Sequence, residues 1–192
     1  CAVDGDVGLY CYYDQNKVTG QPVPDDIAFE VVENTRVFVG NPHSNRVERQ
    51  PYIIISRRET VEDTQRRAKQ FGGEPEMIEP DADELSASGD SGDGKRVTVL
   101  LKLWREYDSD GAVRTVKACE CTHGAVVRPE WDMKITRYPL AWMNWTFVLN
   151  NYHGEAAATS LVHNQDFVNR LFAMSMISLM TTAYPKVIYD KT

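Results

Sequence analysis

The chain has 192 residues, of which 42% are hydrophobic and 26% charged, a mixture that is typical of a globular protein and excludes a largely disordered one. The net charge is −7, and eight of the acids lie within residues 74–94, a stretch without Lys or Arg. The rest of the chain carries 20 acids against 21 bases, which argues against a surface that grips DNA through clustered positive charge.

The first residues and the four cysteines predict where the protein is made. The chain opens with Cys1 and has no initiator Met, no basic leader and no small-residue cleavage site, so we expect an excised segment without a secretion signal. Without such a signal we expect no disulfide framework, and the pattern indicates a reducing cytosolic compartment.

Four short runs in the first third of the chain favour β-strands. They are rich in aromatic or β-branched residues and are separated by segments rich in Gly, Asp, Asn and Pro. The runs are residues 7–14, 27–32, 36–39 and 51–56. The last is apolar without interruption from Tyr52 to Ile55, which predicts burial on both faces.

A short helix is expected directly after the fourth run. Thr60 is a good N-cap, and Glu62 and Asp63 complement the positive end of the helix dipole. Gly72 and Gly73 end the helix, because glycine adopts the backbone conformation of a helix C-terminus without strain.

Residues 74–94 are rich in Asp, Pro, Ser and Gly and offer little for a core to bury, so we expect a mobile acidic loop. An antiparallel meander should follow, because strand-like runs alternate there with short polar turns. Its strands are residues 95–107, 112–121 and 125–128, and an aromatic segment, residues 142–148, comes after them.

A long helix is expected to begin at Thr159 or Ser160 and to run to Ala183, before Tyr184 and Pro185 end it. The predicted fold is α+β, a mainly antiparallel sheet with one short helix and one long C-terminal helix. We divide the chain into a mixed β-rich domain, residues 1–158, and a stem-like helix with an exit segment, residues 159–192.

The two halves of this long helix differ. The first half alternates polar and apolar residues in an amphipathic pattern, whereas residues 171–180 are apolar nearly all the way round. That run is about half the length that a membrane span requires, and Asn169 and Arg170 interrupt any extension. Two interpretations stay open: a core helix of a monomer, or a helix between identical subunits, where small Ser175 and Ser178 permit close approach.

Several motifs resemble those of tailed-phage (prophage) portal proteins, and they occur in the family's order along most of the chain. An aromatic segment and a glycine precede a helix with a Gln and an Asn about four residues apart, which match Gln165 and Asn169. A Pro-Lys exit follows at residues 185–186. A strand pair resembles the family's pair that ends in Asp-Pro, although this chain has Asn41-Pro42.

The resemblance implies a structural protein of the wing and stem region rather than an enzyme, and no cofactor. The subunits would form a homo-oligomeric ring, typically a dodecamer, at the portal vertex of the capsid. The ring would conduct double-stranded DNA without sequence readout during genome packaging and ejection. Its partners would be the terminase and the capsid and tail connector proteins, with no membrane, and it would be made in the cytoplasm of the bacterial host.

The resemblance also places the candidate subunit-interface or channel residues on the long helix. They are Asn164, Gln165, Phe167, Asn169, Arg170, Leu171, Phe172 and Met174. The apolar members would contact neighbouring subunits, and Asn164 and Arg170 would lie nearer to water.

Two other classes of function stay open. Another virion connector or tail protein would share the aromatic segment and the long helix, and a helix–clip–helix downstream would distinguish a portal. A zinc-binding enzyme domain is conceivable because Cys119, Cys121 and His123 alternate along one strand, with Cys1 or Cys11 as a fourth ligand. Their spacing is not that of common zinc modules, and the chain has no nucleophile motif, P-loop or dinucleotide-binding motif.

Aromatic residues are a last candidate for function. Six residues have rings that can stack on bases: Tyr10, Tyr12, Tyr13, Trp142, Trp145 and Phe147. No Lys or Arg is interleaved with them in the sequence, so we favour core packing or an interface.

Overall fold

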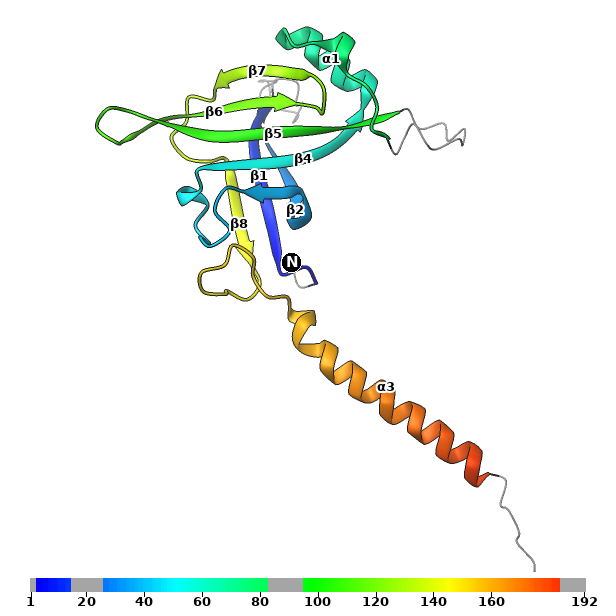
Figure 1. Ribbon diagram of the computed structural model, residues 1–192. Coiled ribbons are helices and arrows are strands. Elements are labelled where there is room, and N and C mark those ends of the chain that lie inside the picture. Colours follow the sequence, from blue (N-terminus) through cyan, green and yellow to red (C-terminus); the bar gives the residue numbers. More distant parts are fainter. Residues whose placement is uncertain (1–2, 15–25, 83–94, 184–192) are drawn as a thin grey trace, which may run out of the picture.

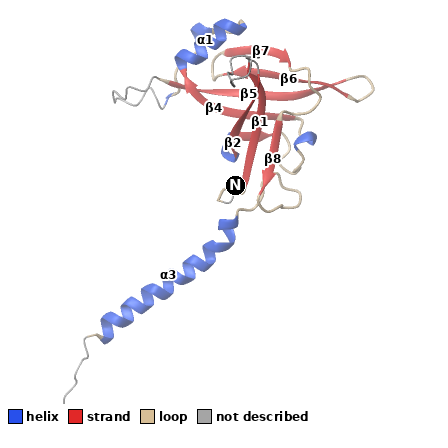
Figure 2. Cartoon of the chain, turned by 180° about the vertical axis from the view of Figure 1, so that it is seen from behind, coloured by secondary structure: helices blue, strands red, loops and turns tan. Residues whose placement is uncertain are grey.

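The computed structural model describes residues 3–14, 26–82 and 95–183 and has an α+β fold with two antiparallel sheets (Figure 1, Figure 2). The predicted fold class is confirmed, including one short helix and one long C-terminal helix. The smaller sheet has the strand order β2-β1-β8, and the larger sheet has the order β3-β4-β5-β6-β7. The strands of the smaller sheet run across those of the larger one rather than along them (Figure 1).

The smaller sheet joins strands from opposite ends of the chain. Strand β1 (Asp6–Asp14) lies between β2 (Asp26–Glu33) and β8 (Leu140–Asn144). Residues directly opposite one another in antiparallel strands point to the same face, and here Tyr10 lies opposite Glu30 and Leu140. Tyr10 and Leu140 are buried in the core, so this register defines an inner face of the smaller sheet and an outer face.

The larger sheet contains the other strands that the sequence predicts. They are β3 (Val37–Val39), β4 (Tyr52–Thr60), β5 (Arg96–Tyr107), β6 (Val113–Cys121) and β7 (Val126–Asp132). Short 3-10 helices connect elements in the described part of the chain: η1 (Asn34–Arg36), η2 (Val47–Arg49) and η3 (Pro75–Met77).

The main core lies between the two sheets and explains one wrong prediction. Ile53 and Ile55 of β4 are fully buried, but Tyr52 is 39% exposed and Ile54 is only half-buried. The strand therefore has one buried face, although its sequence is apolar on both. Lys102 lies over the ring of Tyr52 on the other face, 5.6 Å from its centroid, so part of the apolar surface there is covered by the stem of a long polar side chain.

Helix α1 (Val61–Phe71) has the predicted ends. The Thr60 side chain accepts a hydrogen bond from the Asp63 backbone N–H, and Gly72 ends the helix with φ of 75°. A second, smaller core lies between α1 and the larger sheet. It contains Ala68, Ile78, Val97, Val99, Ala125 and Val127.

The first part of the predicted acidic loop is ordered and has a buried residue. Turn η3 leads into Ile78, which is 3% exposed and completes the core under α1. The Thr98 hydroxyl donates to the Asp81 carboxylate at 2.6 Å, and the Asp81 backbone N–H bonds the carbonyl of Arg96. The prediction of a mobile loop is therefore wrong for residues 74–82, and residues 83–94 lie outside the described residues.

Helix α3 (Ala157–Thr182) leaves the body near the start of β1 and extends away from both sheets (Figure 2). It begins slightly before the predicted Thr159, and the predicted end at Tyr184 and Pro185 lies outside the described residues. No helix within the described ranges is long and apolar enough to cross a membrane.

Gly73 provides a test of how α1 packs on β7. A Cβ at this position would lie 2.2 Å from the Val127 carbonyl oxygen and 2.5 Å from that of Val126. We expect Gly73→Ala to lower the free energy of unfolding by about 1–3 kcal/mol, because backbone must shift to admit the methyl group. Urea unfolding followed by circular dichroism measures the loss.

The matched control is Gly124→Ala. The nearest atom to a Cβ there is the Met77 carbonyl oxygen at 3.8 Å, an ordinary van der Waals distance. We expect a change within about 0.5 kcal/mol. Equal losses in the two variants would contradict the close packing of α1 against β7.

Candidate subunit interface

The C-terminal half of α3 exposes apolar side chains on every side. Ile177, Leu179 and Met180 are between 63% and 71% exposed, and every side chain from residue 161 to residue 183 is exposed. Successive residues of an α-helix point about 100° apart, so these neighbours in sequence cover different sides. An exposed apolar surface of this extent is typical of interaction sites in proteins.

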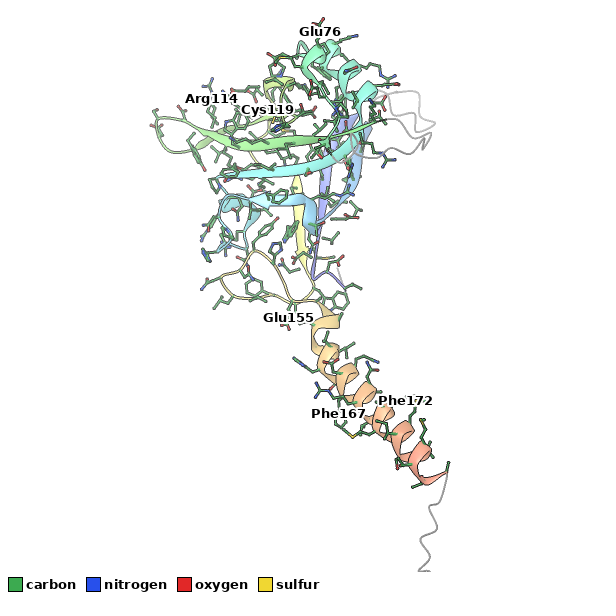
Figure 3. The ribbon with its side chains drawn as sticks, turned by 45° about the vertical axis from the view of Figure 1, so that its right-hand side comes forward. Glu76, Arg114, Cys119, Glu155, Phe167 and Phe172 are labelled. Atoms are coloured by element: carbon green, nitrogen blue, oxygen red, sulfur yellow. The ribbon has the colours of Figure 1, made fainter. Side chains whose placement is uncertain are left out.

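The predicted interface residues all lie on this helix and are all exposed. They are Asn164, Gln165, Phe167, Asn169, Arg170, Leu171, Phe172 and Met174. They do not gather on one face, and Figure 3 shows Phe167 and Phe172 on different sides of the ribbon. The Gln165 amide donates to the Asn169 side-chain oxygen at 2.9 Å, so the two residues that match the portal pattern are partners on the helix surface.

A buried carboxylate fixes the base of α3. Asp6 at the start of β1 is 3% exposed and accepts hydrogen bonds from the Gly154 backbone N–H at 2.6 Å and the Asn144 amide at 3.1 Å. Its other oxygen lies 2.7 Å from Nδ1 of His153. We call Asp6, Asn144, His153 and Gly154 the Asp6 anchor. No local sequence pattern indicates this anchor, because Asp6 is more than 130 positions away from its partners.

Close backbone contacts reinforce the Asp6 anchor. A Cβ on Gly154 would lie 2.7 Å from Cβ of Asn144, and a Cβ on Gly5 would lie 2.7 Å from the Gly154 carbonyl oxygen. Thr146 and Glu155 form an isolated antiparallel bridge directly before the helix (Figure 3 labels Glu155). The chain is therefore held in place up to the first turn of α3.

Aromatic packing completes the base of the helix. Trp142 of β8 stacks on Tyr152 with ring centroids 4.4 Å apart, and Tyr152 is fully buried. Burial raises the pKa of the Tyr152 phenol above its usual value, and the nearby Asp6 carboxylate raises it further. The aromatic segment that the sequence predicts thus joins β8 to the helix base.

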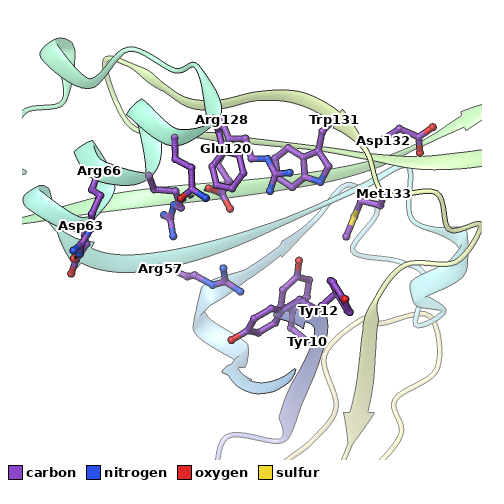
Figure 4. A pocket seen from close by; sticks show the side chains of 14 residues that line it. Tyr10, Tyr12, Arg57, Asp63, Arg66, Glu120, Arg128, Trp131, Asp132 and Met133 are labelled. Atoms are coloured by element: carbon purple, nitrogen blue, oxygen red, sulfur yellow. Dashed lines mark hydrogen bonds and ion pairs between the residues drawn. The ribbon is translucent and has the colours of Figure 1, made fainter. Parts of the chain in front are cut away.

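Arginines and aromatic rings line a cavity of about 600 Å³ between α1, β7 and the end of β1 (Figure 4). The sequence argument against stacking on Tyr10 is incomplete, because Arg57, from strand β4, lies over its ring in the fold. Arg57 lies over the Tyr10 ring at 5.0 Å, and Arg128 lies between Phe71 and Trp131 at 4.1 and 3.7 Å.

Carboxylates neutralise most of the positive charge around this cavity. Arg57 pairs with Glu30 at 2.7 Å, and Arg67 pairs with Glu59 at 2.5 Å and with Glu120 at 3.2 Å. Burial raises the pKa of Tyr10 to about 12, and it lowers the pKa of the Arg128 guanidinium. The arrangement ties the two sheets together through stacked and paired side chains.

The residues considered for a zinc site are not assembled into one. Cys119 and Cys121 lie half-buried on β6 (Figure 3 labels Cys119), and burial raises the pKa of both thiols, which disfavours the thiolate that zinc requires. Cys11 is on the other sheet, and Cys1 lies outside the described residues. Within the described part of the chain, no group of three or more His, Cys, Asp or Glu is placed to hold a metal ion.

Comparison with models of known protein families gave no match, and a search of curated proteins gave none either. The candidate interface therefore depends on the geometry of α3 and on the motifs in the sequence.

The Asp6 anchor can be tested by removing its carboxylate. We expect Asp6→Ala to lower the free energy of unfolding by about 1–3 kcal/mol, because buried donors of Gly154 and Asn144 lose their acceptor. Hydrogen exchange at the Gly154 amide should also accelerate. Asp4→Ala removes the same charge from an exposed position and should change neither quantity. An Asp6→Ala variant with unchanged amide exchange would refute this role.

Proposed function

We propose that this chain is part of a structural subunit of a ring-shaped tailed-phage portal. The ring would conduct double-stranded DNA during genome packaging and ejection, at the portal vertex of the virion. This proposal gives the chain no catalytic role. It assigns the energy of packaging to a partner terminase and later contacts to capsid and tail connector proteins.

One observation carries the proposal: α3 is a helix of 26 residues whose side chains are exposed along its length and apolar on all sides of its second half. Fully burying a Leu, Ile, Met or Phe side chain stabilises a protein by roughly 1.5–3 kcal/mol. The two sheets have their own cores without α3, so the helix is available to other copies. A ring supplies such neighbours on both sides of each subunit.

The charge of the chain supports the second part of the proposal. Outside residues 74–94 the acids and bases nearly balance, so the protein lacks the excess of Lys and Arg that binds DNA phosphates tightly. A channel must let DNA slide, and a nearly neutral wall permits sliding.

The full-length protein, with its native flanking segments, tests the proposal. We expect closed rings in electron microscopy and a single high mass in light scattering. We expect Ile177→Asp to abolish the rings, because it places a charge in the middle of the apolar half of α3, where Ile177 is 63% exposed in one chain.

His163→Asp is the matched control for Ile177→Asp. It adds the same charge to the same helix at an exposed position that is already polar, and rings should persist. A full-length protein that stays monomeric at all concentrations would refute the proposed function. Loss of rings in both variants would show that the added charge, rather than the apolar half of α3, decides assembly.

A further inference from the structure

The outer face of the smaller sheet is a second exposed apolar surface. Leu9 of β1 lies opposite Val31 of β2 and Ala141 of β8, so these three side chains share a face. In the same way, Val7 lies opposite Met143, and Cys11 lies opposite Phe29. We call Val7, Leu9, Cys11, Phe29, Val31, Ala141 and Met143 the outer face.

The outer face resembles a core surface more than a solvated one. Val31 is 69% exposed, Phe29 is 63% exposed and Met143 is 57% exposed. Its one charged neighbour in the register is Glu33, at the end of β2, which pairs with Arg36 at 3.2 Å. A sheet with one face in the core usually carries polar residues on the other, so an apolar outer face indicates a missing layer.

The chain's own α3 is directed away from this face. The Asp6 anchor and the bridge between Thr146 and Glu155 hold the backbone as far as the first turn of the helix. To cover the outer face of its own sheet, the helix would have to reverse direction within one or two residues after Glu155. A copy of α3 that covers this face would therefore have to come from a different chain.

The dimensions of the two surfaces match. The outer face extends about 13 Å along β1, from Val7 to Cys11, and about 10 Å across its three strands. An α-helix has a diameter of about 10 Å, and α3 is about 39 Å long. A helix that lies along β1 would therefore cover the full width of the outer face with one of its sides.

We propose that α3 of one copy packs on the outer face of the smaller sheet of the next copy. This inference rests on the proposed function, because it names the surface that receives the helix in the ring. Residues 171–183 contain no charged side chain, and neither do the seven residues of the outer face. Each copy gives a helix to one neighbour and receives one from the other, a heterologous contact that can close into a ring.

Cys11 makes this contact testable by disulfide cross-linking in the full-length protein. In a background where the other cysteines are replaced by serine, each residue from 171 to 180 is changed to cysteine in turn. A disulfide needs Cβ atoms about 3.5–4.5 Å apart, so only helix positions that face Cys11 can form one. We expect cross-linked multimers at positions three or four residues apart, at least about tenfold above the same variants with Cys11→Ser.

A mixing experiment separates contacts between copies from contacts within one copy. One preparation carries the helix cysteine with Cys11→Ser, and the other carries Cys11 alone. We expect the assembled mixture to give a cross-linked dimer but no longer products, with mass spectrometry identifying the peptide of β1 joined to α3. A mixture that gives no cross-linked dimer, while the variant with both cysteines forms a disulfide within a single copy, would overturn the inference.

A charge on the outer face gives an independent measurement. We expect Phe29→Glu to weaken assembly of the full-length protein by at least about tenfold, with an unchanged circular dichroism spectrum, since Phe29 is exposed in one chain. Phe38→Glu is the control, because Phe38 is 53% exposed but lies on β3 of the larger sheet. It should leave assembly unchanged.

The outcomes distinguish this inference from the proposed function. Rings without any cross-link to Cys11, or rings that form normally with Phe29→Glu, would overturn the inference and leave the portal proposal standing. A protein that forms no rings in any preparation would overturn both.

Discussion

The central constraint on this molecule is that the described part of its chain leaves the apolar surface of α3 uncovered. A helix that is apolar on one side can lie on a sheet, but the second half of α3 exposes Leu, Met, Ile and Phe on all sides. Water is a poor environment for these groups, and each one gains free energy when another surface covers it. The proposed assembly follows from this constraint, because other copies of the chain would supply the surface that covers α3.

The body meets this constraint by folding without the helix. Its main core lies between the two sheets, and a second core lies under α1; neither includes a residue of α3. The Asp6 anchor joins the two parts through the first residue of β1 and the residues that precede the helix. A subunit of this kind can fold first and assemble afterwards, because assembly does not compete with its own core.

Local signals in the sequence predicted most of the elements. Thr60, Asp63 and Gly72 define both ends of α1 by contacts within a few residues, and such contacts can be read from sequence alone. The pairing of β1 with β8, the Asp6 anchor and the arginines around Tyr10 depend on residues far apart in the chain, so no local pattern reveals them. The outer face cannot be predicted from sequence for the same reason. The alternation of residues along β1 shows that the strand has two faces, but it does not show which face the larger sheet covers. The interface residues on α3 are exposed as expected, while their contacts and the portal function stay predictions.

Because α3, in the described part of the chain, is attached to the body only at its first turn, a small rotation there moves its far end by a large distance. A helix of 26 residues is about 39 Å long, so a tilt of about 10° at its first turn would move its far end by about 7 Å. Small changes among Asp6, His153 and Gly154 would thus be magnified at the tip, while the sheets stay still. In a closed circle of subunits, such a tilt in every copy would widen or narrow the central opening without any change inside the bodies.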